Sequence, residues 1–127
     1  MQKTSFNPDD IAAPVGGYAH GCLAAEGRRI LFVSGQIPAA PDGSIPPDFE
    51  SQARNVWRNI ESVLREAGMG LDNLVKITAF LTDRAHVLPN RKIRQEVLGD
   101  RRIAMSAIIA GTLDSDWLLE VEAIAMD

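Results

Sequence analysis

FESQARNVWRNIESVLREAGMGLDNLVKITAFL spans residues 49–81 and places a helical pattern directly before a strand pattern. Apolar side chains in its first part recur at steps of three and four residues, which predicts an amphipathic helix. These residues are Phe49, Ala53, Val56, Trp57, Ile60, Val63, Leu64 and Ala67. Asp48 suits the N-cap, because its carboxylate can accept a hydrogen bond from a free backbone N–H. Gly68 and Gly70 predict the end of the helix, since glycine tolerates positive φ.

The second part of this stretch, Leu74 to Leu81, alternates with the period of a strand. One predicted face carries Leu74, Lys76, Thr78 and Phe80, and the other carries Val75, Ile77, Ala79 and Leu81. A shorter helix is predicted further along, from about Pro89 to Leu98. Proline is favourable in the first turn of a helix, and Gly99 follows the last apolar residue.

The other apolar runs predict further strands. Residues 18–25 and 29–35 are separated by Glu26-Gly27-Arg28, a connection of hairpin length, so we expect these two runs to pair antiparallel. Four prolines and an Asp-Gly pair predict a loop over residues 36–47. The last two strands are predicted at 105–111 and 118–125, and a turn containing Asp114-Ser115-Asp116 joins them.

This order of elements predicts a single α+β domain over residues 1–127, in which two helices cover one face of a mixed, mostly antiparallel sheet. The other face then has no cover. Phe80 points away from the helices in this arrangement, and Phe32 alternates in the same way against Leu31 and Val33. An exposed apolar sheet face usually marks an interface, so we expect a cyclic oligomer. Composition does not distinguish a dimer from a trimer.

The composition narrows the functional classes. With 127 residues and a net charge of −4, the chain is not expected to bind nucleic acid generally. Basic residues do cluster between 91 and 102, but Glu96 and Asp100 interleave with them, as on a solvated helix face. Cys22 is the only cysteine, and neither histidine has metal-ligand spacing, so we expect no disulfide and no metal. No signal or membrane segment is evident, which predicts a cytoplasmic protein without membrane contact.

Several short motifs together resemble the RidA/YjgF family of reactive intermediate deaminases, also labelled endoribonuclease L-PSP or translation initiation inhibitor. The motifs are Gly16-Gly17-Tyr18, Phe32-Val33-Ser34-Gly35-Gln36-Ile37-Pro38, Gln52-Ala53, Asn59, Ala67-Gly68, Val75 to Asp83, and Glu120-Val121-Glu122-Ala123-Ile124-Ala125. The resemblance implies a chorismate-mutase-like fold, a homotrimer with ligand clefts between subunits, and no cofactor. It also implies hydrolysis of small enamines and imines, such as 2-aminoacrylate, to 2-keto acids and ammonia.

The resemblance implies specific roles for two positions. Hydrolysis of an imine needs a group that orients the attacking water, and Glu120 matches the family's glutamate in that role. A substrate carboxylate needs a fixed cation, and the family supplies an arginine in the pattern Pro-Ala-Arg-Ser. Here the pattern reads Ile103-Ala104-Met105-Ser106, so both the proline and the arginine are absent. Deamination of 2-imino acids should therefore be weak or absent, unless Arg91, Arg94, Arg101 or Arg102 reaches the cleft.

The other ligand-binding residues implied by the resemblance are Tyr18, Ser34, Gly35, Asn90 and Ala107, together with Met105 itself. Most of them have a purely structural alternative. Met105 can simply pack beside its strand neighbours, in which case the pocket binds something neutral or apolar. Tyr18 can be a half-buried edge residue, Ser34 and Gly35 can be a strand end, and Asn90 can be a polar residue at a helix start. Gly17 and His20 also replace the proline and the glutamine of the family's Gly-Pro-Tyr-Ser-Gln pattern.

Three functional hypotheses follow. The first is a divergent RidA-like hydrolase acting on a small metabolite, with Glu120 positioning water. The second is a trimer that binds a small molecule, or takes part in an interaction, without turnover. The third, a ribonuclease or translation inhibitor, is disfavoured by the acidic charge balance.

Overall fold

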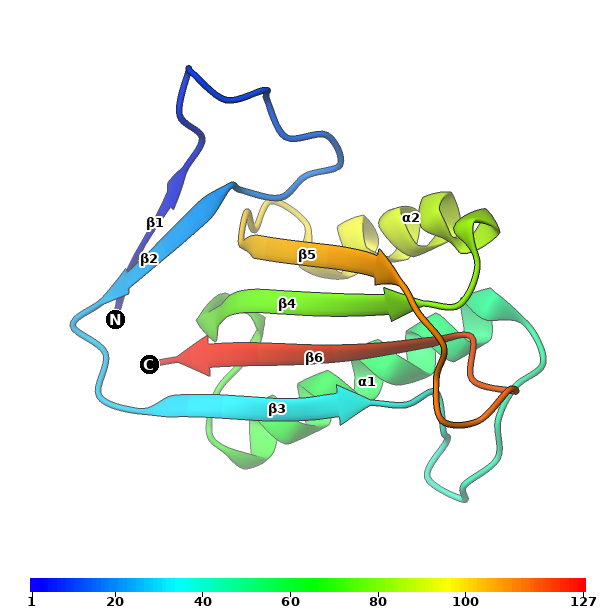
Figure 1. Ribbon diagram of the computed structural model, residues 1–127. Helices are drawn as coiled ribbons and strands as arrows, with labels where there is room; N and C mark the ends of the chain where they lie inside the picture. The colour runs from blue at the N-terminus through cyan, green and yellow to red at the C-terminus, as the bar shows by residue number, and fades with distance from the viewer.

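A computed structural model describes residues 1–127 and has an α+β architecture (Figure 1). The strands are β1 (Gln2–Phe6), β2 (Gly21–Ala25), β3 (Ile30–Gln36), β4 (Leu74–Leu81), β5 (Ala104–Ile109) and β6 (Leu119–Met126). The helices are α1 (Phe49–Glu66) and α2 (Val87–Leu98), and short 3₁₀ turns η1 (Leu71–Asn73) and η2 (Arg84–His86) precede β4 and α2. The predicted α+β class is therefore confirmed.

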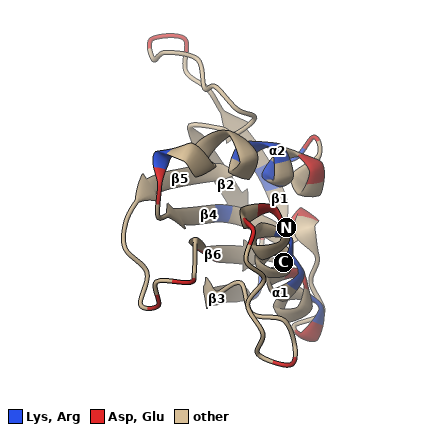
Figure 2. Cartoon of the chain, turned by 90° about the vertical axis from the view of Figure 1, so that its right-hand side faces the viewer, with Lys and Arg blue, Asp and Glu red and all other residues tan.

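The main sheet has the strand order β3-β6-β4-β5. β4 and β5 run parallel, whereas β6 is antiparallel to both β3 and β4. A parallel pair needs a crossover connection, and α2 provides it between β4 and β5. Both helices lie on the same side of this sheet (Figures 1 and 2).

The predicted hairpin between residues 18–25 and 29–35 is wrong. β2 pairs antiparallel with β1, a strand that the sequence pattern did not predict, and β3 pairs with β6. Figure 1 shows β1 and β2 set apart beside the β5 edge, while β3 forms the opposite edge of the sheet. Ala19 bridges to Ala104 at the β5 edge, which fixes this position. An apolar run in the sequence indicates that a segment is extended, but it does not indicate which strand the segment pairs with.

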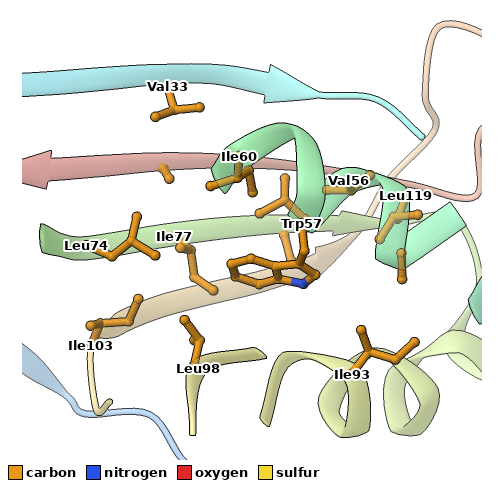
Figure 3. Close-up of a cluster of buried hydrophobic side chains, with 14 of the residues drawn as sticks. Val33, Val56, Trp57, Ile60, Leu74, Ile77, Ile93, Leu98, Ile103 and Leu119 are labelled. Atoms are coloured by element: carbon orange, nitrogen blue, oxygen red, sulfur yellow. The ribbon is translucent and has the colours of Figure 1, made fainter. Parts of the chain in front are cut away.

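Helix α1 packs one face against the sheet. Its buried face includes Val56, Trp57, Ile60 and Leu64, each at most 3% exposed. Figure 3 shows Trp57 extending from α1 towards Ile77 of β4 and Leu98 of α2. Burying each large aliphatic side chain contributes roughly 1.5–3 kcal/mol, so this cluster holds both helices on the sheet.

The inward face of β4 differs at one residue from the expected alternation. Leu74 is fully buried, and Val75 is only half-buried. A register irregularity against β6 between Leu74 and Lys76 accounts for the change, because an extra residue in one strand switches the face that follows. From Ile77 onwards the predicted inward positions are confirmed, with Ile77, Ala79 and Leu81 buried.

Two polar side chains of α1, the buried Gln52 and the half-buried Asn59, hold the loops at the end of the sheet. Gln52 donates to the carbonyls of Pro46 and Asp116 at 2.8 and 2.9 Å, and its amide oxygen accepts from the Leu118 N–H at 2.8 Å. Asn59 donates to the carbonyls of Ile37 and Ala39. The loop over residues 36–47 is therefore ordered by the helix beside it.

The opposite face of the sheet carries no helix. Phe32 is 73% exposed there, and Ile30 is also exposed. Lys76, Thr78 and Glu122 lie on the same face and line a shallow hollow with Phe32. The uncovered apolar face expected from the alternation of β3 and β4 is present.

Candidate functional site

A cavity of about 340 Å³ opens between α2 and β5. It is lined by Val15, Leu81, Arg84, Val87, Asn90, Arg91, Arg94, Met105, Ala107, Ile108 and Ile109. Three predicted ligand-binding residues, Asn90, Met105 and Ala107, are thus brought together. Most of the wall is apolar, and its ionisable side chains are all arginines.

The strand register explains why Met105 and Ala107 share this cavity. Met105 pairs with Ile77 and Ala107 with Ala79, so both follow the helix-facing side of the sheet. β5 is an edge strand, and α2 leaves part of this side uncovered. Met105 is half-buried and packs against the hydrophobic core, while Asn90 is 4% exposed on α2.

Two of the four arginines considered as substitutes for the missing cation reach this cavity. Arg91 and Arg94 line it, and their spacing of three residues places them on one face of α2. Arg101 instead forms an ion pair with Asp72 at 2.6 Å, and Arg102 donates to the Gly99 carbonyl. The sequence interpretation missed Arg84 as a third cationic lining residue.

Arg94 is the most confined of these cations. Its side chain is 4% exposed, and its Nη2 donates a hydrogen bond to the Gly16 carbonyl. Burial lowers the pKa of Arg94, repulsion from Arg91 lowers it further, and the phenol of Tyr18 acts in the opposite direction. Gly16 and Gly17 have φ values of +103° and +80°, a turn that favours glycine and presents the Gly16 carbonyl to α2.

Tyr18 lies near this group but does not line the cavity. Its ring packs edge-on against His20, with ring centroids 5.9 Å apart. Tyr18 lies close enough to Arg94 to counteract part of the lowering of the Arg94 pKa. Tyr18 is therefore a neighbour of the cavity in the isolated chain.

Glu120 and Gly35 form a second group elsewhere, and Ser34 precedes Gly35 on β3. Glu120 pairs with Phe80 across β6 and β4, on the face without helices. It lines a hollow with Phe80, Ala110, Gly111, Thr112 and Leu113. A Cβ at position 35 would overlap the Glu120 carboxylate, so glycine is what lets this carboxylate lie against the β3 backbone.

Most of the predicted site residues therefore fall into two groups on opposite faces of the sheet. The α2 cavity holds Asn90, Met105 and Ala107, whereas Glu120 lies on the open face against Gly35. Tyr18 lines neither hollow. A single chain does not bring the two groups together. The spacing of these residues in the sequence could not reveal this separation.

The histidines and the cysteine take no part in either group. His20 Nε2 lies 2.7 Å from the Ala12 carbonyl oxygen, and His86 stacks on Phe49 with ring centroids 4.5 Å apart. Partial burial raises the pKa of the Cys22 thiol. No cluster of three or more His, Cys, Asp or Glu side chains has metal-binding geometry, and neither helix is long and apolar enough to cross a membrane.

Fold and site together define a class of small α+β protein, with two helices on one face of the sheet and candidate ligand-binding residues on both faces. The family model described as Endoribonuclease L-PSP matches residues 10–127. The chain belongs to this family, the RidA/YjgF family, which confirms the resemblance found in the sequence.

Individual relatives agree with this assignment. A RutC family protein of Pyrococcus abyssi is 33% identical over 98% of each chain. The Escherichia coli protein named "Putative reactive intermediate deaminase TdcF" is 29% identical over 88% of each chain.

Solved structures show the same fold. The Rid family protein YyfB of Yersinia pestis aligns over the whole of both chains with a TM-score of 0.86 and 24% identity, a likeness in fold alone. Escherichia coli TdcF with bound serine aligns over 90% of this chain and 91% of its own, with a TM-score of 0.69 and 30% identity.

Proposed function

We propose that this protein hydrolyses a small enamine or imine metabolite in a cleft completed by a second copy of the chain, with Glu120 positioning the water. The observation that carries the proposal is the placement of Glu120. Its half-buried carboxylate lies over Gly35 and makes no hydrogen bond or ion pair within the chain. A carboxylate left free in a hollow can accept a proton from water.

Hydrolysis of an imine requires few groups on the protein besides the Glu120 carboxylate. An enamine first takes up a proton at carbon, and an imine at nitrogen, so both enter as the iminium ion. Water adds to the carbon of the C=N bond and gives one proton to the carboxylate, which leaves a neutral carbinolamine. The carboxylic acid returns this proton to the amine nitrogen, the C–N bond breaks and ammonia leaves. The hydroxyl group then loses its proton to the carboxylate, and a carbonyl compound remains.

The separation of the two groups of residues supports a cleft between copies. One chain cannot present Glu120 and the α2 cavity to the same small molecule, because they lie on opposite faces. A second copy packed on the exposed face around Phe32 can bring its own α2 cavity towards Glu120. A homotrimer, as in the sequence-based expectation, provides three such clefts. The relative TdcF, solved with bound serine, supports a ligand of this size.

Turnover of 2-iminobutyrate and 2-aminoacrylate, generated in place, tests the proposal by timing the release of keto acid. We expect faster release than in buffer, and a fall of about 100-fold in the Glu120→Gln variant, the range seen for loss of a general base. Glu122→Gln is the matched control, because Glu122 lies two residues away on the same face of β6. Equal rates for the two variants would remove the role of Glu120.

A second candidate function is binding without turnover. The observation that favours it is Met105, which offers no hydrogen-bond donor where the family resemblance places an arginine. In that case the assembly and ligand binding persist, but keto-acid release equals the rate in buffer with every imine tested.

A further inference from the structure

The α2 cavity is cationic in a protein that is acidic as a whole. Arg84, Arg91 and Arg94 line it, and no aspartate or glutamate does. The net charge of the chain is −4. Figure 2 shows the basic segments of α2 in blue. Such a local excess of positive charge in a mostly apolar hollow favours an anion with an apolar body.

Arg94 gives the strongest evidence for an anion site, because it is the only buried charged residue of the chain. Burying an unpaired charge is unfavourable, and proteins normally compensate it with a counter-ion. Arg29, Arg54 and Arg101 each have a carboxylate partner, but Arg84, Arg91 and Arg94 have none.

Arg91 adds a second unpaired cation at the same place. It lies so close to Gly16 that a Cβ there would come within 2.7 Å of Nε. Its charge repels Arg94 and contributes to the lowered pKa of Arg94. An anion bound between the two guanidinium groups would remove this repulsion and compensate the buried charge.

The bond from Arg94 to the Gly16 carbonyl is the structural alternative. It secures the Gly16–Gly17 turn on α2. It occupies one donor of a guanidinium that has five, however, and it gives no reason for Arg91 to be adjacent. A role confined to the turn also needs no positive charge.

We propose that Arg94 and Arg91 bind the carboxylate of a small acid whose apolar body lies against Met105. Helix α2 thereby supplies the cation that position 105 lacks. This inference rests on the proposed function in that it assigns the substrate class of the same cleft, namely small carboxylic acids. Met105 and Val87 then contact carbon atoms of the ligand, for which a thioether and a methyl surface are suited.

Calorimetric titration of the assembled protein with 2-methylpropanoate and with its amide tests the proposal, because the two probes differ mainly in charge. We expect saturable binding of the acid and at least about tenfold weaker binding of the amide, the size of one charge-assisted hydrogen bond. Arg91→Met and Arg94→Met should each weaken acid binding by a similar factor. Lys92→Met is the matched control, because it removes one exposed charge from the same helix outside the cavity.

Arg94→Lys guards against misfolding of the methionine variant, because it keeps the charge and should retain part of the acid binding. Equal affinity for acid and amide, or arginine variants that match Lys92→Met, would overturn the proposal. Inorganic phosphate binding as tightly as the acid would overturn the carboxylate assignment. The test does not depend on turnover. If the protein binds the acid but hydrolyses no imine, only the proposed reaction is contradicted. If it hydrolyses neutral imines but does not bind the acid, only the proposed arginine site is contradicted.

Discussion

The two faces of the sheet hold different halves of a candidate site. On the helix-covered side, the cavity beside α2 carries buried positive charge and no carboxylate. On the open side, Glu120 is a carboxylate without a cationic partner, and it shares its hollow with the exposed Leu113. Each half holds a charge that the other lacks. In the proposed function, one copy supplies the anion-binding half of the site and another copy supplies the water-activating half.

The largest expected effect comes from breaking the contact between copies. Phe32→Glu places a charge on the open face, where burial in an interface would be costly. We expect the assembly to dissociate to the 13.8 kDa chain in light scattering, and activity to fall to the buffer rate. Leu88→Glu is the matched control, since Leu88 is a similarly exposed apolar residue on α2, at 67% compared with 73% for Phe32. A Phe32→Glu variant that keeps both mass and activity would contradict a site shared between copies.

The next largest effect concerns only the half of the candidate site on the open face, which contains the Glu120 carboxylate. Gly35→Ala introduces a Cβ that overlaps the Glu120 carboxylate and must displace it. Because a small misplacement of a catalytic group costs up to about 100-fold in rate, we expect kcat to fall at least tenfold. The affinity for 2-methylpropanoate should stay unchanged, since Gly35 lies outside the α2 cavity. Gly70→Ala serves as the control, because a Cβ there meets no atom within 4 Å. Equal loss of acid binding and kcat would show that the two halves are not separate.

A smaller effect is expected in the cationic half. Met105→Arg restores the arginine of the family resemblance, but it brings a further positive charge towards Arg91 and Arg94. We expect the affinity for 2-methylpropanoate to rise by less than about tenfold. The ligand-free protein should melt a few degrees lower, because like charges repel. Met105→Gln is an uncharged control of similar size. No gain in acid affinity would mean that position 105 does not face the ligand.

The sequence predicted local structure well and spatial relations less well. Periodicity located both helices and the strands that became β4, β5 and β6, with ends within a few residues. It paired residues 18–25 with 29–35 incorrectly, because strand pairing depends on contacts far apart in the chain. The missed strand β1 is mostly exposed, so it has no clear alternation of apolar residues.

The candidate site shows the same limit. The family resemblance named Met105, Asn90 and Ala107 as ligand-binding residues, and the structure places all three in one cavity. The strand register shows that the two β5 residues among them share a face of the sheet. The resemblance could not show that Glu120 lies on the opposite side of the sheet. The burial of Arg94 was hidden as well, because the sequence pattern of a charged helix residue resembles that of a solvated helix face. The spacing of Arg91 and Arg94 was the one available signal.

The smallest expected effect concerns Trp57, whose side chain lies in the core between the sheet and α2 (Figure 3). Its indole Nε1 is buried without a hydrogen-bond partner. Trp57→Phe removes this unpaired donor, which is favourable, and leaves a small void, which is unfavourable. We expect these effects to offset each other to within about 1 kcal/mol in the free energy of unfolding, measured by chemical denaturation. Acid affinity and turnover should both stay near the values of the unaltered protein. If acid affinity falls while turnover of a neutral imine persists, the packing of α2 sets the geometry of the arginine pair independently of the carboxylate half.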